Sequence, residues 1–136
     1  MNNNPMHITL SSIRWKGMSR QQNDPHFVEF KSPMFSYCAA FIIFFYYRHN
    51  HGCITVRQLV NCWAPSAGFD RRRLLHRLSK SRTISLDKPI AGCDFFSYIN
   101  IMYAISRSIN DCIPSRTHIA MGLWHARRAL DKGFSV

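Results

Sequence analysis

The length, composition and charge of the chain limit what it can be. Its 136 residues suffice for one domain with a substantial core. The composition, 46% apolar and only 18% charged, argues against intrinsic disorder. The 18 Lys and Arg residues outnumber 7 acids, and the net charge of +11 attracts polyanions. We therefore expect a single globular domain, residues 1–136, that meets nucleic acid, anionic lipid or an acidic cell-wall polymer.

The first expected element is a small β-hairpin. Residues 7–15 and 26–30 are short runs that carry aromatic and β-branched side chains, and a long polar segment separates them. Such a pattern is typical of two strands joined by a loop.

A central, fully surrounded helix is expected next. Pro33 suits a first helical turn, and every residue from 37 to 47 is apolar or aromatic, so no polar face remains. The run is much shorter than the roughly 20 apolar residues of a membrane span. It therefore predicts a core helix that ends within residues 48–52.

Four further helices follow. Thr55 and Gln58 form a capping box for a helix that runs to about Trp63, where Ala64-Pro65 is expected to stop it. Asp70 caps a basic helix over residues 70–80, and Asp94 starts an apolar helix that breaks at 110–114. The last helix covers about 115–131. The fold class is thus mainly α, an α+β arrangement of about five helices with one N-terminal hairpin.

Cysteine usage and the first residues predict where the protein is made. The cysteines are odd in number and never spaced as C-x-x-C, which indicates buried free thiols in a reducing compartment: Cys38, Cys53, Cys62, Cys93 and Cys112. His49, His51 and Cys53 lack the spacing of a zinc site, so we predict no metal and no other cofactor. No secretory signal opens the chain, so the protein is expected to be cytoplasmic as made.

Few residues could carry hydrolytic chemistry. Glycosidases usually need two carboxylates, and Asp70, Asp94 and Asp24 are accounted for as caps or a turn residue. The candidates are therefore Glu29, the one glutamate, and Asp111. No nucleotide-binding or common hydrolase motif occurs.

The densest positive segment is the predicted helix over residues 70–80. It carries Arg71, Arg72, Arg73 and Arg77, with Lys80 and Arg82 close behind. Such a run can follow a phosphate backbone, or it can be a solvated helix face.

In order, the motifs of the chain resemble a family of small proteins from phages and mobile elements of bacteria. The family opens N-N-N-P-G-N-I-R, which stands here as residues 2–9, NNNPMHIT. The likeness spans nearly the whole chain and continues through W-x-G at 15–17, F-x-x-F-x-S-P at 27–33, a Tyr at 46 or 47, G-x-x-T at 52–55 and W-A-P at 63–65. Members are often labelled structural proteins.

The resemblance implies a lysozyme-like fold in a circularly permuted, glucosaminidase-like arrangement. In the family a late helix ends in E-N-G, where this chain has Ile109, Asn110 and Asp111, so the expected glutamate is absent. The polar residues after W-A-P are replaced by residues 68–71, GFDR. The scaffold motifs are thus retained while the polar ones are reduced.

We therefore expect a divergent, catalytically degenerate protein that binds an acidic cell-wall polymer or a partner protein, at the cell envelope or in a virion. Its expected binding residues are Asn3, Asn4, Trp15, Trp63, Arg71, Arg72, Arg73 and Arg77. One alternative is a peptidoglycan hydrolase in which Asp111 replaces the acid and Glu29 assists. Another is a nucleic-acid-binding protein that uses the arginine run. In each case Asn3 and Asn4 should bind backbone groups, and Pro5 should fix a bend.

Overall fold

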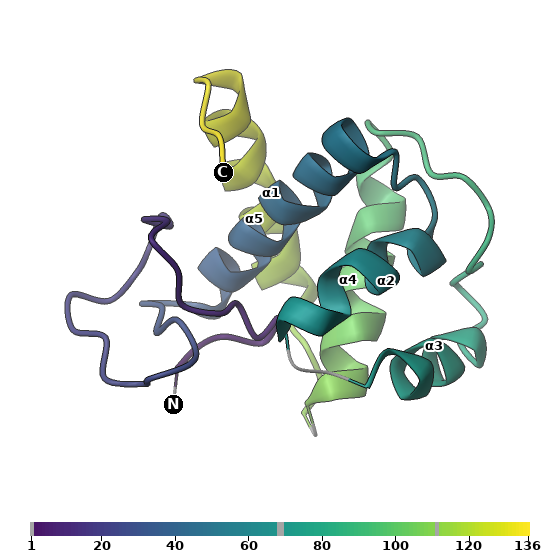
Figure 1. Ribbon diagram of the computed structural model, residues 1–136, viewed down its shortest axis with the longest axis horizontal. Coiled ribbons are helices and arrows are strands. Elements are labelled where there is room, and N and C mark those ends of the chain that lie inside the picture. Colours follow the sequence, from purple (N-terminus) through teal and green to yellow (C-terminus); the bar gives the residue numbers. More distant parts are fainter. Residues whose placement is uncertain (1, 68–69, 111) are drawn as a thin grey trace.

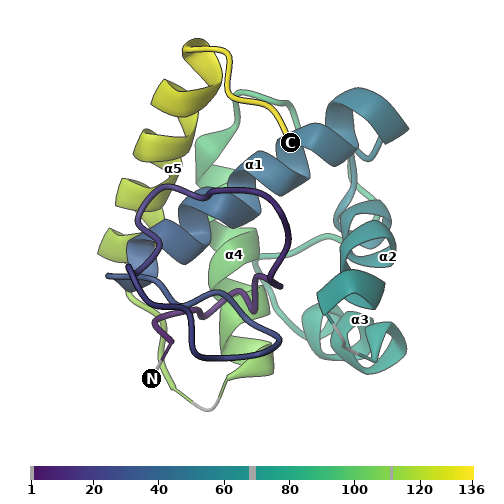
Figure 2. The same ribbon diagram turned by 60° about the vertical axis from the view of Figure 1, so that its left-hand side comes forward.

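The computed structural model describes residues 2–67, 70–110 and 112–136, and the described part of the chain is mainly helical. Its helices are α1 (Pro33–His51), α2 (Val56–Ala67), α3 (Arg71–Ser79), α4 (Phe95–Ile109) and α5 (Arg116–Asp131). In Figures 1 and 2, α1 crosses the middle of the molecule, with α5 along one side and α2 and α3 on the other. The mainly α prediction is confirmed.

Helix α1 is the core element, as its uniform apolar run predicts. Ser32 caps it by accepting a hydrogen bond from the Met34 N–H, and Pro33 occupies its first turn. Gly52 ends it with φ 65°, a left-handed conformation that glycine adopts without strain. Its residues from Ser36 to Ile42 are all buried. No helix in the described parts of the chain is long and apolar enough to cross a membrane.

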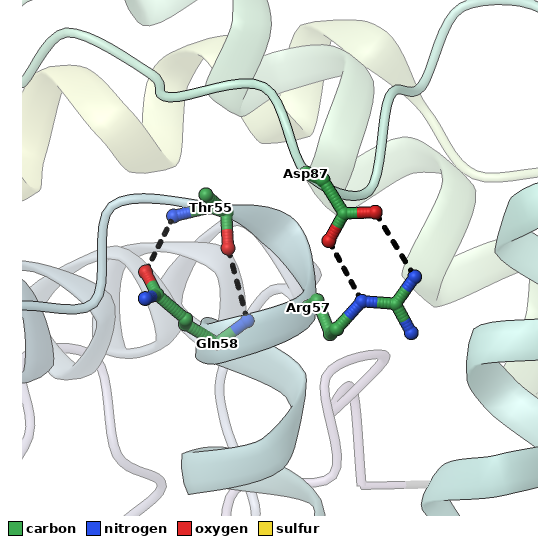
Figure 3. Close-up of polar contacts among 4 residues, drawn as sticks. All are labelled: Thr55, Arg57, Gln58 and Asp87. Atoms are coloured by element: carbon green, nitrogen blue, oxygen red, sulfur yellow. Dashed lines mark hydrogen bonds and ion pairs between the residues drawn. The ribbon is translucent and has the colours of Figure 1, made fainter.

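Helix α2 begins as predicted and ends later than predicted. The capping box is formed reciprocally: Gln58 N–H donates to Thr55 Oγ1 and Thr55 N–H donates to Gln58 Oε1, each at 3.2 Å (Figure 3). The expected stop at Ala64-Pro65 is wrong, because the helix continues to Ala67. A proline near a helix end removes one hydrogen bond of the last turns, so it need not end the helix there.

The caps of α3 and α4 agree with the sequence, and the structure adds one at the start of α5. Asp70 accepts hydrogen bonds from the N–H groups of Arg72 and Arg73 at the start of α3. Asp94 accepts one from Ser97 N–H at the start of α4, and Ser115 accepts one from His118 N–H at the start of α5. These bonds satisfy amide groups that a helix start leaves free.

The expected N-terminal hairpin is not formed by regular strands in residues 2–32. Thr9 faces Phe27 and Met18 faces Phe30 in isolated antiparallel bridges. The Val28 N–H donates to Ile8 O at 3.0 Å, but the Ile8 N–H donates to the Asn4 side chain at 2.8 Å, and the Asn4 amide donates to Val28 O at 2.9 Å. The Asn4 amide thus stands where the second bond of a ladder pair would form, which explains why strand pairing stays local.

The close approach of α5 to α1 yields a stability prediction. A Cβ added to Gly122 would lie 2.5 Å from Met34 O and 2.8 Å from Tyr37 Cβ. We expect Gly122→Ala to lower the free energy of unfolding by about 1–3 kcal/mol, because overpacking outweighs the gain in helix propensity. Urea unfolding followed by circular dichroism measures it. Ala120→Ser, on the exposed face of the same helix, should change it by less than about 0.5 kcal/mol; a Gly122→Ala protein as stable as the parent would contradict this packing.

Candidate binding site

The asparagine turn, residues 2–5, is held by side-chain amides. Asn4 Nδ2 donates to Ile8 O and Val28 O at 2.9 Å each, while its Oδ1 accepts from Ile8 N–H and from Ser36 Oγ. The fully buried Ser36 hydroxyl also accepts from Met6 N–H at 3.0 Å. Asn4 therefore joins the turn, the bridged segments and α1 through one amide.

Asn3 and Pro5 complete the turn. Asn3 Nδ2 donates to Phe30 O at 3.1 Å, and the backbone of Asn3 is left-handed, with φ 50°. The His7 N–H donates to Asn4 O at 3.0 Å, which closes a turn with Pro5 at its second position. The predictions that both asparagines bind backbone groups and that Pro5 fixes the bend are confirmed.

Asn2 connects the turn to an acidic side chain. Asn2 Nδ2 donates to Asp24 Oδ2 at 2.7 Å, and Asp24 Oδ1 accepts from the N–H groups of His26 and Phe27. These hydrogen bonds, those from the backbone first, lower the pKa of the Asp24 carboxyl below its usual value of 3.8. The carboxylate form therefore supports the loop above that pH, and its support is lost as the pH falls through the lowered pKa.

A cavity of about 440 Å³ opens beside this turn. Its wall joins the turn to His7 and Phe27, the first turns of α1, the end of α4, and the segment that leads into α5. We call it the asparagine cavity; its described lining residues are Asn2, Asn3, Asn4, Pro5, His7, Phe27, Pro33, Tyr37, Ser106, Asn110, Cys112, Ile113, Pro114, Ser115 and His118.

Asn110 connects the asparagine turn to the end of α4. Its Nδ2 donates to Pro5 O at 2.8 Å, and its Oδ1 lies 3.1 Å from His7 Nε2. Asn110 also caps α4, where its own N–H donates to Ser106 O. In the sequence, Asn110 aligns with the asparagine of the family's E-N-G motif, but no role was predicted for it. His7 and Asn110 are 103 positions apart, so no local sequence pattern indicates that they pair.

The floor of the cavity is a buried hydroxyl pair. Tyr37 Oη lies 2.9 Å from Ser106 Oγ, which joins α1 to α4. Burial raises the pKa of the Tyr37 hydroxyl, and the hydrogen bond to Ser106 opposes that change. Tyr37 therefore stays neutral near pH 7 and can offer only a hydrogen bond.

The two predicted catalytic carboxylates do not form a described pair. Glu29 lies in its own loop, where Oε2 accepts from the N–H groups of Asn23 and Asp24, and it does not line the asparagine cavity. Asp111 lies outside the described residues. Among the described lining residues none carries a carboxylate.

The side chains of Trp15 and Trp63 are buried in the core. They expose 6% and 2% of their surface, and both border a second cavity of about 210 Å³. Trp15 stacks at a tilt against Phe134, and its buried Nε1 has no hydrogen-bond partner among the described residues. A binding role for either tryptophan stays a prediction.

The arginine run lies on the outer face of α3. Arg71, Arg72 and Arg73 are exposed, whereas Leu74 and Leu78 of the same helix are buried in the core. Arg77 donates a hydrogen bond to Ser108 O, which brings the basic helix to the same end of α4 that Asn110 caps. The arginines do not line the asparagine cavity.

The donor set of the site suits neutral, hydroxyl-rich ligands. Side-chain amides, imidazoles and hydroxyls can donate and accept hydrogen bonds without a formal charge. Phe27, Pro33 and Ile113 add apolar surface, as ligand pockets usually require. In the described part of the chain no three His, Cys, Asp or Glu side chains are placed to hold a metal ion.

Comparison with known proteins does not assign the chain. No protein-family model matches it, and no curated protein matches it.

The Asn4 network gives a second stability prediction. We expect Asn4→Ala to lower the free energy of unfolding by about 2–4 kcal/mol, since it leaves several buried or half-buried backbone groups and the Ser36 hydroxyl without a partner. Chemical denaturation measures it. Asn23→Ala, an exposed loop asparagine, serves as the control and should stay within about 0.5 kcal/mol of the parent. Equal stability of the two variants would contradict the role given to Asn4.

Proposed function

We propose that this protein is a lysozyme-like binding protein that holds an acidic cell-wall polymer without cleaving it, at the cell envelope or in a virion. The observation that carries the proposal is the asparagine cavity, whose described wall offers amides, imidazoles and hydroxyls but no carboxylate. Such groups can bind sugar hydroxyl and acetamido groups, whereas glycoside cleavage needs an acid that none of the described lining residues supplies.

The loss of acid chemistry at the end of α4 supports a non-catalytic role. The resemblance places the family's glutamate at Ile109, a half-buried aliphatic side chain that cannot transfer a proton. Glu29 is engaged by backbone N–H groups of its own loop. A lone aspartate at position 111 would lack the second carboxylate of the usual pair.

The charge of the protein supports an acidic ligand. A net charge of +11 gives a field that attracts polyanions, and one of the exposed arginines of α3, Arg77, donates to Ser108 O near the end of α4 that borders the cavity. We propose that these arginines draw in the anionic groups of the polymer while the cavity binds its sugar units. Attraction of this kind weakens as salt is added.

The helical frame is compatible with the lysozyme-like part of the proposal. A buried central helix begins next to an asparagine-rich turn, and one amide joins the two. This arrangement keeps the turn and the start of α1 together as one wall of the cavity.

Co-sedimentation with cell-wall sacculi that retain teichoic acid tests the function. We expect the full chain to be retained, and His118→Ala to weaken binding about three- to tenfold, the effect of losing one hydrogen bond in the cavity. His49→Ala, an exposed histidine at the opposite end of α1, should bind like the parent. Retention that persists undiminished after removal of teichoic acid would exclude the acidic polymer as the ligand.

Zymography on peptidoglycan separates binding from hydrolysis. We expect neither the parent nor Asp111→Asn to clear the gel. Clearing that Asp111→Asn abolishes would establish the hydrolase instead.

Nucleic acid is the second candidate ligand, and the exposed arginine run on α3 favours it. If it holds, Arg71→Gln, Arg72→Gln and Arg73→Gln together should reduce the slope of log affinity against log salt by about 2–3, since each phosphate contact contributes about 0.9. Titration of a labelled duplex across salt concentrations measures it. Glutamines at the exposed Arg14, Lys16 and Arg20 remove the same charge elsewhere and should have a smaller effect; equal effects would mean unspecific attraction.

A further inference from the structure

Two thiols meet where α1 turns into α2. Cys53 Sγ and Cys62 Sγ lie 3.1 Å apart, and the structure records both cysteines as free. A disulfide bond is about 2.05 Å long, so a movement of about 1 Å would bring the sulfurs to bonding distance.

The backbones that carry these thiols are already fixed. Gly52 ends α1 in a left-handed conformation, and the next N–H, that of Cys53, donates to Tyr47 O at 3.3 Å. Cys62 lies within α2, and its neighbour Trp63 packs edge-on against Phe44 of α1 with ring centroids 5.8 Å apart. The pair therefore meets without any rearrangement of the helices.

We propose that Cys53 and Cys62 are a redox modification site that closes to an intramolecular disulfide in the presence of a small-molecule disulfide such as oxidised glutathione. This site is independent of the proposed polymer binding. The other cysteines do not share its geometry: Cys38 is buried in α1, and Cys93 and Cys112 are exposed. The expectation that all five thiols are buried is therefore wrong for Cys93 and Cys112, which lie outside the apolar interior of the helices.

The different exposure of the two thiols sets the order of the reaction. Cys62 is partly exposed, whereas Cys53 is only 4% exposed. The Cys62 thiolate attacks one sulfur of oxidised glutathione, which forms a mixed disulfide and releases one glutathione thiolate. Cys53 then loses its proton to water, and its thiolate attacks Cys62 Sγ, which forms the protein disulfide and releases the second glutathione as a thiolate; the two glutathione thiolates take up protons from water. Two protein thiols are oxidised and one glutathione disulfide is reduced to two thiols.

Burial explains why the second step needs the neighbour. It raises the pKa of the Cys53 thiol, so Cys53 remains protonated at neutral pH and reacts poorly with reagents in solution. An adjacent mixed disulfide at Cys62 presents a sulfur within reach of it. The disulfide would link the segment between α1 and α2 to α2 itself and so fix the position of α2 against the end of α1.

Peptide mapping of the oxidised full chain tests the proposal. Trypsin cuts after Arg48, Arg57 and Arg71, so Cys53 falls in peptide 49–57 and Cys62 in peptide 58–71, with no other cysteine in either. The protein is used with Cys93→Ser and Cys112→Ser, which remove the exposed thiols. After exposure to oxidised glutathione we expect the two peptides to be linked, the intact mass to fall by two hydrogen atoms, and dithiothreitol to restore both.

The controls decide whether the fold selects this pair. Cys62→Ser in the same background should give no linked peptide and leave Cys53 without a glutathione adduct. Oxidation of the urea-unfolded chain should give a lower yield of the 49–57 to 58–71 link, with links to Cys38 as well. A lasting glutathione adduct on Cys62 without the link, no reaction of the folded protein, or an equal yield from the unfolded chain would each overturn the proposal.

Discussion

The N-terminal third of the molecule depends on the side-chain amide of Asn4. This amide stands between Ile8 N–H and Val28 O, two groups that would bond directly in a regular ladder, and it also binds Ser36 of the central helix. Buried amide groups must find partners, so the insertion satisfies the backbone and prevents continuous strands at the same time. A segment with hardly any secondary structure is thereby fixed against α1.

The same turn makes the cavity. Once the turn is seated on Ser36, Pro5 O and His7 face the end of α4, where Asn110 binds both. The cavity wall is thus formed by the asparagine turn, the first turns of α1, the end of α4 and the segment that leads into α5. Its shape therefore depends on that long-range closure.

The acids of this protein mostly serve its own backbone. Five of them act as caps, loop acceptors or an ion-pair partner: Asp24, Glu29, Asp70, Asp87 and Asp94. Asp131 lies at the end of α5 opposite His118. The side chains of Arg71, Arg72 and Arg73, in contrast, are exposed, and the net charge of +11 leaves the positive field uncompensated. This distribution of charge is compatible with the proposed binding of a polyanion.

Local signals in the sequence determined the helices, because caps and apolar periodicity act within a few residues: Thr55, Asp70 and Asp94 cap the helices expected of them. The hydrogen bonding of the asparagine turn followed from its motif. The end of α2 did not, since Pro65 is tolerated within the helix. Only the tertiary structure decided that Asn4 replaces strand pairing, that Asn110 meets His7, and that Cys53 meets Cys62. Each of these contacts joins separate segments of the chain, and their energy is gained only after the chain has folded around α1.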